Sequence, residues 1–461
     1  MKKAVLIVTP IDVLLPASEF KWLVNQPESD VGYHVDDEDQ LEHILFLNQH
    51  LLRTILRNRL ISTVLTRETY NLVPALLGEI RYTVDNLLGT DTENFHEICA
   101  RSTIQNVSCR VMNRVFVGRS ISRNAKFSNA VTAYIRNTPT VSRLLRFIWK
   151  PLRPLAALFL TLPARIRTWK IYDILGLEIE RRLKVAEANG IEPELKATEN
   201  DLLQWMVDGI KLSNDPRRFK FNMLFGSILT FNFAAMTTVS SSMTHAIVDL
   251  ACSKKEYLGE LRVEISSVIA KHGGKFDKRA LASMVKLDSL MRESQRINTP
   301  VTVSIPRSVV KKGGIKTPSG IHVPQGAVMV VPTYSIMRDA AIYPDPCTFK
   351  PFRFAGEPTA PGLEGQNGNA QGSLPPPTNP PQPWVKATPE YTAFGYGPHA
   401  CPGRHIAAVG VKLMMAYIIA HYDFETEEKR PENIWIGHSQ VGPQKTTVRI
   451  RRRKEKDVVF A

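Results

Sequence analysis

The stretch from residue 221 to residue 248 contains no Asp, Glu, Lys or Arg, and no other feature constrains the fold as strongly. A helix of about 20 apolar residues can cross a lipid bilayer. However, Asn222, Asn232 and seven Ser and Thr residues within 230–244 would be costly in lipid. We therefore predict a helix over 219–251 that is buried inside a large globular protein.

Helical periodicity extends from residue 41 to Ile297, and a short β-rich part follows. Apolar residues recur at spacings of three and four through 41–136. Further helices are predicted over 168–189, 201–212, 219–251, 255–272, 278–297 and 406–422. After Pro300, β-branched runs at 301–305 and 327–331 are separated by turn sequences and predict strands. The predicted fold class is mainly α with a small β-rich region.

Local sequence patterns predict the structure of both chain ends and of one internal segment. The apolar run at 4–8 is interrupted by Pro10 and Asp12, which predicts a short strand pair rather than a targeting segment. Alternation over 447–450 predicts a terminal strand, and the basic cluster that follows is expected to be its solvated end. The Pro- and Gly-rich segment 356–386 is predicted to be a flexible surface loop.

Residues 145–170 mix Trp, Phe and Leu with Arg and Lys and are broken by three prolines. Two interpretations remain open. A bent pair of core helices is the interpretation we favour. The other is an interfacial patch that contacts a membrane surface.

Composition limits the partners and the redox chemistry. The chain has 59 Lys and Arg against 44 Asp and Glu, a net charge of +15, so an anionic partner is expected. No recognition motif accompanies this charge, so nucleic-acid binding is not predicted. The five cysteines are odd in number and never in C-x-x-C spacing, which argues against a disulfide framework and a Cys-rich zinc module.

One cysteine, Cys401, lies in a segment that reads FGYGPHACPGR from Phe394 to Arg404. It precedes a predicted helix, where backbone N–H groups favour a thiolate and suit a sulfur that acts as a metal ligand. The neighbouring glycines allow tight turns and the close approach of a flat group. The alternative is a structural cysteine beside a helix cap.

The spacing F-x-x-G-x-x-x-C-x-G, here Phe394, Gly397, Cys401 and Gly403, resembles the haem-binding loop of the cytochrome P-450 monooxygenases. The resemblance implies a fold in which haem b lies between a long oxygen-binding helix and the cysteine loop. It implies that Cys401 is the axial thiolate ligand of the iron, that Phe394 packs near the sulfur, and that His399 contacts a haem propionate. A thiolate ligand favours O–O cleavage.

Two further motifs of this family occur upstream of the cysteine in the family order. Glu293 and Arg296 form an E-x-x-R pair, which taken alone is typical of solvent-exposed ion pairs. By resemblance they join Arg353, from the Pro-Phe-Arg-Phe segment, in a buried network. Arg307 stands where the family places a propionate-binding arginine, with a strand-end charge as the alternative. Arg53 and Arg57 are candidates for another propionate contact.

The predicted helix over 219–251 resembles the family's oxygen-binding helix. Thr238 then corresponds to the threonine that assists proton delivery, although Thr237 stands where an acid or His is usual. The alternative is a pair of hydroxyls that bond back to the preceding turn. The substrate pocket is expected to include Ala234, Ala235, Thr299, Val301 and Val303.

The resemblance covers nearly the whole chain, so residues 1–461 are expected to form one catalytic domain. It is closest to fungal members related to ent-kaurene oxidase, which implies oxygenation of a bulky apolar secondary metabolite such as a terpenoid, indole-terpenoid, alkaloid or polyketide intermediate. Members of this type begin with a membrane anchor, which we expect this sequence to lack.

The resemblance also implies partners and a location. Electrons are expected from NADPH through cytochrome P-450 reductase, docked behind Cys401. The expected location is the cytosolic face of the endoplasmic reticulum membrane, with the cytoplasm as the alternative. Two other functions stay open: a haem-thiolate isomerase or dehydratase, and a non-enzymatic basic protein that binds membranes or nucleic acid.

Overall fold

The computed structural model describes residues 5–7, 12–33, 66–146, 148–188, 200–210, 216–356, 380–425, 429–436 and 439–454, and every structural statement below refers to these. Arg53, Arg57 and residues 357–379 of the predicted loop lie outside these ranges.

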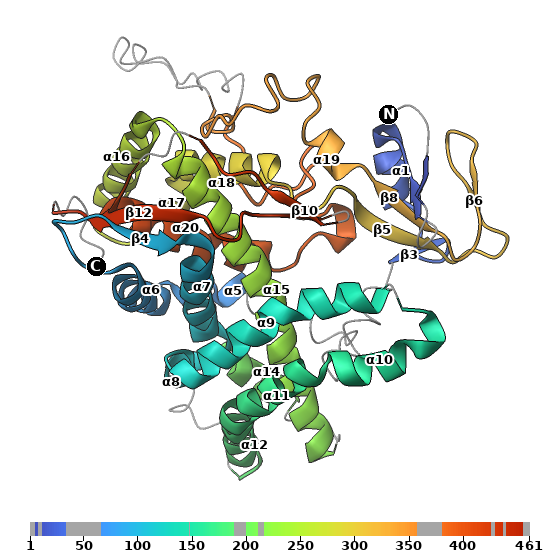
Figure 1. Cartoon of the computed structure of the whole chain (residues 1–461), viewed down its shortest axis with the longest axis horizontal. Coiled ribbons are helices and arrows are strands. Elements are labelled where there is room, and N and C mark those ends of the chain that lie inside the picture. The colour runs from blue at the N-terminus through green and yellow to red at the C-terminus, as the bar shows by residue number, and fades with distance from the viewer. Residues whose placement is uncertain are drawn as a thin grey trace, which may run out of the picture.

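The centre of the fold is the long helix α15 (Arg217–Ala251), which confirms the helix predicted from the uncharged stretch. It packs against α7 (Ala100–Phe116), α18 (Val285–Ile297) and α20 (Arg404–His421), and Figure 1 shows it running through the middle of the molecule. Its length and composition would allow it to cross a membrane, and it is the only described helix of which this is true. Its neighbours on several sides instead make it a core helix.

The other described helices precede and follow α15 along the chain. They are α1 (Phe20–Val24), α5 (Thr66–Glu68), α6 (Val73–Leu88), α8 (Gly118–Ser122), α9 (Ala125–Arg146), α10 (Arg153–Leu160), α11 (Leu162–Ile171), α12 (Leu177–Ala188), α14 (Leu202–Ile210), α16 (Lys255–Lys271), α17 (Lys278–Ser283) and α19 (Thr333–Ile336). Short 3-10 turns are η1 (Ala17–Glu19), η3 (Lys150–Leu152) and η5 (Gly397–His399), and η4 (Tyr172–Gly176) is a π-helical turn. The helix predicted over 278–297 is interrupted, because Met284 leaves the helical conformation between α17 and α18.

A five-stranded sheet forms the β-rich part, with the strand order β1-β2-β8-β5-β3. Its strands are β1 (Val5–Ile7), β2 (Asp12–Leu14), β3 (Val31–Tyr33), β5 (Ser304–Val309) and β8 (Val328–Val331). Strands β1 and β2 are the strand pair expected at the N-terminal end. The strand predicted over 301–305 begins three residues late, at Ser304. Ile305 inside it has a φ of 57°, and the register shifts between Ser304 and Arg307.

Three smaller sheets complete the strands. They are β4 (His96–Cys99) with β12 (Thr447–Arg452) and β9 (Tyr422–Phe424), β6 (Ile315–Lys316) with β7 (His322–Val323), and β10 (Ile434–Ile436) with β11 (Ser439–Val441). Strand β12 confirms the predicted terminal strand. The expectation of a solvated basic end is wrong for Arg452, whose guanidinium lies 2.5 Å from the Asp85 carboxylate. The Tyr417 hydroxyl donates to the same carboxylate, so this arginine closes a polar cluster between β12, α6 and α20.

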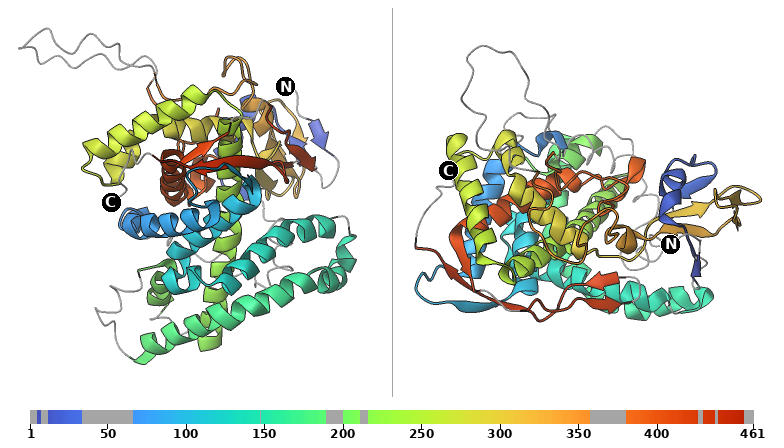
Figure 2. Two further views of the ribbon diagram at one scale, coloured as in Figure 1. Left: turned by 60° about the vertical axis from the view of Figure 1, so that its left-hand side comes forward. Right: turned by 90° about the horizontal axis from the view of Figure 1, so that it is seen from above.

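Two hydrophobic cores hold the helices and the five-stranded sheet together, and a third, small cluster of Leu14, Val328 and Val330 lies on the sheet. The larger is built from the helices around α15 and the smaller from the five-stranded sheet and α1. Figure 2 shows the sheet and α1 at one end of the molecule beside the helices. The Tyr396 ring packs against Phe20 of α1 at a centroid distance of 5.4 Å. The segment just before Cys401 therefore rests on the smaller core. None of the five cysteines is in a disulfide bond in the described part of the chain.

A buried polar network ties the C-terminal segment to the central helix. The Arg430 guanidinium contacts the Asp249 carboxylate and lies 3.0 Å from His245 Nδ1, both on α15. From α18, Ser294 donates to Asp249 at 2.6 Å and Asn298 accepts from Arg430 at 2.9 Å. Burial, reinforced by the Arg430 charge, lowers the pKa of His245 to about 3. His245 is consequently neutral in the folded protein at physiological pH.

This network makes the stability depend on pH. The pKa of His245 is about 3 in the folded protein, and the unfolded chain has the ordinary value of 6.5, so protons bind the unfolded chain first as the pH falls. We expect His245 to reduce the free energy of unfolding by about 1.4 kcal/mol per pH unit between about pH 6 and pH 3. Urea unfolding of wild type and His245→Gln at pH 7.5, about 6 and about 5 measures this effect. Exposed His322→Gln serves as the control, and parallel curves for wild type and His245→Gln would contradict the assignment.

Candidate functional site

The Cys401 loop enters α20 through two tight turns. Gly395 and Gly397 have φ values of 71° and 73°, a region that residues with a side chain rarely adopt. The Cys401 N–H donates to the Phe394 carbonyl at 2.7 Å and closes the loop. Gly403 is the N-cap of α20, so Cys401 stands two residues before the cap.

The half-buried Cys401 thiol is subject to opposing influences. Burial raises its pKa, whereas the backbone N–H groups of Gly403 and Arg404 and the Arg404 charge lower it. Burial prevails, so the lowered pKa expected from the helix start is wrong for the cysteine by itself. An anionic sulfur here needs a positive ion beside it, and the two N–H groups then stabilise that anion further.

The middle of α15 presents an open face of small side chains. Ala234 and Thr238 are exposed and one turn apart, whereas Phe231, Asn232 and Met236 beside them are buried. The Thr238 hydroxyl donates to the Ala234 carbonyl at 2.8 Å, as one of the two interpretations of the sequence predicted. The hydroxyl keeps its lone pairs, which can accept a hydrogen bond from water.

Thr237 uses its hydroxyl in the same way, donating to the Phe233 carbonyl at 2.8 Å. Thr237 and Ala235 are half-buried, so they face less open space than Thr238. Of the two threonines, Thr238 is therefore the one more accessible to a bound molecule.

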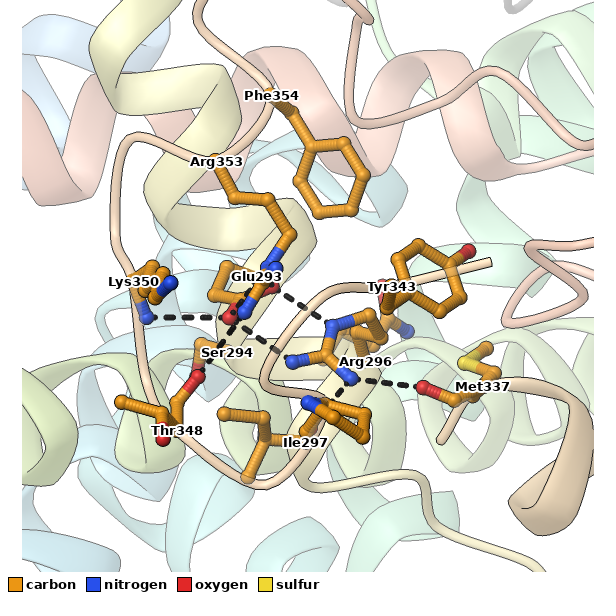
Figure 3. A network of polar contacts seen from close by, with 12 residues as sticks. Glu293, Ser294, Arg296, Ile297, Met337, Tyr343, Thr348, Lys350, Arg353 and Phe354 are labelled. Carbon is orange, nitrogen blue, oxygen red and sulfur yellow. Dashed lines mark hydrogen bonds and ion pairs between the residues drawn. The ribbon is translucent and has the colours of Figure 1, made fainter. Parts of the chain in front are cut away.

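The Glu293 carboxylate is fully buried and bound from three directions. Arg296 of the same helix donates to it through Nε at 2.7 Å and Nη2 at 2.9 Å. Arg353 donates through Nε at 3.0 and 3.1 Å, and the Lys350 backbone N–H donates at 3.1 Å. Figure 3 shows the two guanidinium groups converging on this carboxylate. The structure therefore brings together the three predicted network residues. It buries Glu293 and Arg296 completely and Arg353 in part, unlike a solvent pair.

The two arginines bind backbone carbonyls as well as Glu293. Arg296 Nη1 donates to the carbonyls of Met337 and Pro346 at 2.7 and 2.8 Å. Arg353 Nη1 donates to the Pro344 carbonyl at 2.6 Å. The network thus fastens the irregular segment 337–353 onto α18.

A second set of contacts from α18 reaches the Cys401 loop, and sequence reasoning missed it. The Gln295 side-chain oxygen accepts from Trp384 Nε1 at 2.5 Å and from the Tyr391 hydroxyl at 3.1 Å. The Trp384 ring lies 5.5 Å from the Phe394 ring, and the Arg292 guanidinium stacks on Tyr391 at 3.7 Å. Helix α18 therefore positions the segment that leads into the loop, through Tyr391 and through Trp384, which packs on Phe394. The sequence carries no spacing signal for these contacts, because Gln295 and Trp384 are far apart along the chain.

Comparison with known proteins identifies this arrangement. The family model for cytochrome P450 matches residues 18–449. The chain belongs to the cytochrome P450 family. In fold it is similar to a retinoic acid bound cyanobacterial CYP120A1, with a TM-score of 0.66 at 18% identity over 96% of this chain and 89% of that one. The predicted fold class is confirmed.

Its relatives among curated proteins are fungal P450 monooxygenases. The chain is 30% identical to monooxygenase htyF of Aspergillus rugulosus over 89% of its own length and 60% of the relative's. It is 29% identical to monooxygenase gloP of Glarea lozoyensis over 96% of its length and 82% of the relative's. Family membership assigns the enzyme class, monooxygenase, and a haem-thiolate cofactor.

The residues present fit haem in this P450. Cys401 occupies the cysteine position of the predicted loop motif, and it lies beside the N-terminus of α20. A Cβ added to Gly403 would meet nothing within 4 Å, which leaves room for a flat group next to the sulfur. The exposed Ala234 and Thr238 belong to α15, which packs against α20. Cys401 would hold the iron and the small α15 side chains would leave space above it.

The two predicted propionate residues lie in different surroundings. His399 Nε2 lies 3.1 Å from the Glu28 carboxylate, so this structure pairs it with an acid. Arg307 is buried on β5, opposite Met329 of β8, and its Nη1 donates to the Pro306 carbonyl at 2.9 Å. Its burial excludes the alternative of an ordinary strand-end charge. The propionate roles stay predictions.

The predicted pocket residues after α18 separate into two groups. Thr299 is fully buried and its hydroxyl donates to the Arg296 carbonyl at 2.9 Å, so it supports the Glu293 network instead of facing open space. Val301 and Val303 are half-buried, and Val301 bridges to Ser439 of β11. The β10–β11 hairpin therefore lies beside the predicted pocket segment.

Loss of Glu293 is expected to destabilise the protein strongly. Glu293→Ala leaves the buried Arg296 guanidinium and the half-buried Arg353 guanidinium without their carboxylate, which costs on the order of 3 to 5 kcal/mol. Chemical unfolding and haem content measure this effect. The matched control is Glu260→Ala, which removes a half-exposed pair with Lys286 and should cost about 1 kcal/mol or less. Equal losses for the two variants would contradict the network.

Replacing the predicted ligand should change the haem spectrum. Cys401→Ser is expected to abolish the red-shifted Soret band of the CO adduct of the reduced protein, because that band requires a thiolate donor. Cys347→Ser, at an exposed free cysteine, is the matched control and should keep the band. If Cys401→Ser retained the band, another residue would be the ligand.

Proposed function

We propose that this P450 inserts one oxygen atom from O2 into a bulky apolar secondary metabolite, such as a terpenoid, indole-terpenoid, alkaloid or polyketide intermediate. The observation that carries the proposal is that α20, which follows the Cys401 loop, packs against α15, whose middle exposes the small residues Ala234 and Thr238. Small side chains on that face leave room for O2 and an apolar molecule. The fungal P450 monooxygenases among its relatives support an oxygenation of this kind.

Haem with a thiolate ligand supplies O–O bond cleavage when it is bound, because the sulfur donates electron density to the iron. The protein's own residues supply position and protons. The Cys401 loop is held by the N–H bond to Phe394 and by the packing of Trp384 on Phe394. The Thr238 hydroxyl already donates to a carbonyl, so it acts by accepting a hydrogen bond from water and holding that water in place.

Protons must reach the site through such ordered water, because a threonine hydroxyl has too high a pKa to be an acid itself. Thr237, in the position where an acid or His is usual, holds its proton on the Phe233 carbonyl. We therefore assign the proton path to Thr238 and water, with Thr237 in a lesser role.

Family membership implies O2 and a redox partner. We propose that the partner is NADPH-cytochrome P-450 reductase and that the protein works at the cytosolic face of the endoplasmic reticulum membrane. The positive charge of the chain supports docking of an acidic reductase surface.

One observation favours a second candidate, a haem-thiolate isomerase or dehydratase. Both Thr237 and Thr238 donate their protons to backbone carbonyls, and the usual acid is missing. Such an enzyme would convert its substrate without NADPH. The CO-difference spectrum is common to both candidates, and NADPH demand separates them.

Coupling measurements test the role of Thr238. Thr238→Ala should keep haem and substrate binding but lower the product formed per NADPH by about tenfold or more, with hydrogen peroxide released in its place. Thr237→Ala should have a smaller effect. Thr230→Ala is the matched control, because Thr230 makes the same back-bond, to Gly226 at 3.0 Å, elsewhere on the helix. Equal coupling in all variants would remove Thr238 from the mechanism, and turnover without NADPH would favour the isomerase.

A further inference from the structure

The β10–β11 hairpin is bound to the stretch of chain between α18 and β5. We call this stretch, residues 298–303, the pocket segment, because three of the predicted pocket residues belong to it. The Gln440 N–H donates to the Pro300 carbonyl at 2.8 Å. Ser439 forms a β-bridge with Val301. The position of the pocket segment therefore depends on the position of the hairpin.

The start of the pocket segment is held by the Asn298 side chain, which is bonded at both of its polar atoms. Its oxygen accepts from Arg430 Nη2 at 2.9 Å and from Asn433 Nδ2 at 2.8 Å. Its nitrogen donates to the Asp249 carboxylate at 2.8 Å and to the Ser294 carbonyl at 2.9 Å. Asn298 is buried, and Asn433 immediately precedes β10. One buried amide thus joins the hairpin to α15 and to α18.

Arg430 spreads its guanidinium over groups from three parts of the chain. Its Nε contacts the buried Asp249 carboxylate of α15. Its Nη2 donates to Asn298 and lies 3.0 Å from His245 Nδ1, and its Nη1 donates to the Pro431 carbonyl at 2.8 Å. The planar fork of an arginine makes these contacts together, whereas the compact ammonium group of a lysine cannot span them.

Gly442, directly after β11, lies against the same His245 ring. A Cβ added to Gly442 would lie 2.9 Å from His245 Cε1, closer than a side chain can approach. His245 and Gly442 are both buried, so the ring is enclosed. The chain before the hairpin is therefore fixed to His245 of α15 through Arg430, and the chain after it through Gly442.

We propose that Arg430 is a positioning residue that determines how tightly this P450 holds large apolar molecules. It acts through Asn298 and the hairpin, which together fix Val301 and Val303 of the pocket segment. An apolar pocket selects molecules by shape, so a displaced wall affects a large molecule more than a small one. The proposal rests on the proposed function in one respect, since it takes the pocket segment as a wall of the substrate site.

Hydrogen exchange of the full-length, haem-loaded chain tests the positioning directly. Arg430→Lys keeps a cation near Asp249 but loses the bond to Asn298. We expect the amide of Gln440 to exchange at least about tenfold faster in this variant, because the hairpin opens more often. The amides of α16 should exchange as in the wild type. Unchanged exchange at Gln440 would overturn the proposal.

Two ligands of the haem iron test the effect on the site, because an imidazole nitrogen binds iron and shifts the Soret band. Imidazole itself needs little more than the iron, whereas clotrimazole, an imidazole with three bulky aromatic rings, also needs the surrounding pocket. Arg430→Lys should raise the Kd of clotrimazole by about tenfold or more and change the Kd of imidazole by less than about twofold. A purely structural role would lower the free energy of unfolding and leave the ratio of the two Kd values unchanged, and that result would overturn the proposal.

A second variant reaches the same contacts without changing a charge. Gly442→Ala pushes on His245 and should give the same separation of the two Kd values, so the test does not depend on how well Arg430→Lys folds. The matched control is Arg449→Lys, at a half-exposed pair with Glu425, which should behave like the wild type in both measurements. Neither measurement uses turnover. Failure of the proposed monooxygenation, seen as turnover without NADPH, is therefore distinguishable from failure of the Arg430 proposal.

Discussion

The buried Glu293 carboxylate is the interaction on which the candidate site depends. It receives two side-chain cations and one backbone N–H, and each donor comes from a different position along the chain. A buried anion is tolerated only where its hydrogen bonds are complete. Because Arg296 and Arg353 also bind carbonyls of residues 337–348, the same carboxylate fixes a segment that has almost no regular secondary structure.

Helix α18 extends this control to the metal-ligand loop. Gln295 lies between Glu293 and Arg296 on this helix. Its side chain accepts hydrogen bonds from Trp384 and Tyr391, and Trp384 packs on Phe394. The loop itself is closed by the hydrogen bond that the Cys401 N–H donates to the Phe394 carbonyl. Contacts of Gln295 with Trp384 and Tyr391, none of which touches the sulfur, therefore help to position it. Burial raises the pKa of this thiol, so an anionic sulfur at this position needs a positive ion beside it.

The central helix α15 both packs in the core and presents an open face of small side chains. Its C-terminal end and one side are core, packed against α7, α18 and α20, while Ala234 and Thr238 stay accessible in its middle. Hydroxyl groups that bond back to the preceding turn allow polar residues to stand in an apolar helix at little cost. The open face of small residues on α15 is thus compatible both with a stable core helix and with the binding of a molecule at the candidate site.

The sequence by itself determined the features that depend on local pattern. The uncharged stretch predicted α15, alternation predicted β12, and the spacing around Phe394 and Cys401 indicated the family. Tertiary structure decided what depends on burial and on partners far away in the chain. It reversed the predicted pKa direction of Cys401, paired Arg452 with Asp85, and exposed the large apolar side chains of α10 and α11, although the sequence predicted a bent core helix pair there. Periodicity shows that a helix has an apolar face, but only packing decides whether that face meets the core or the solvent.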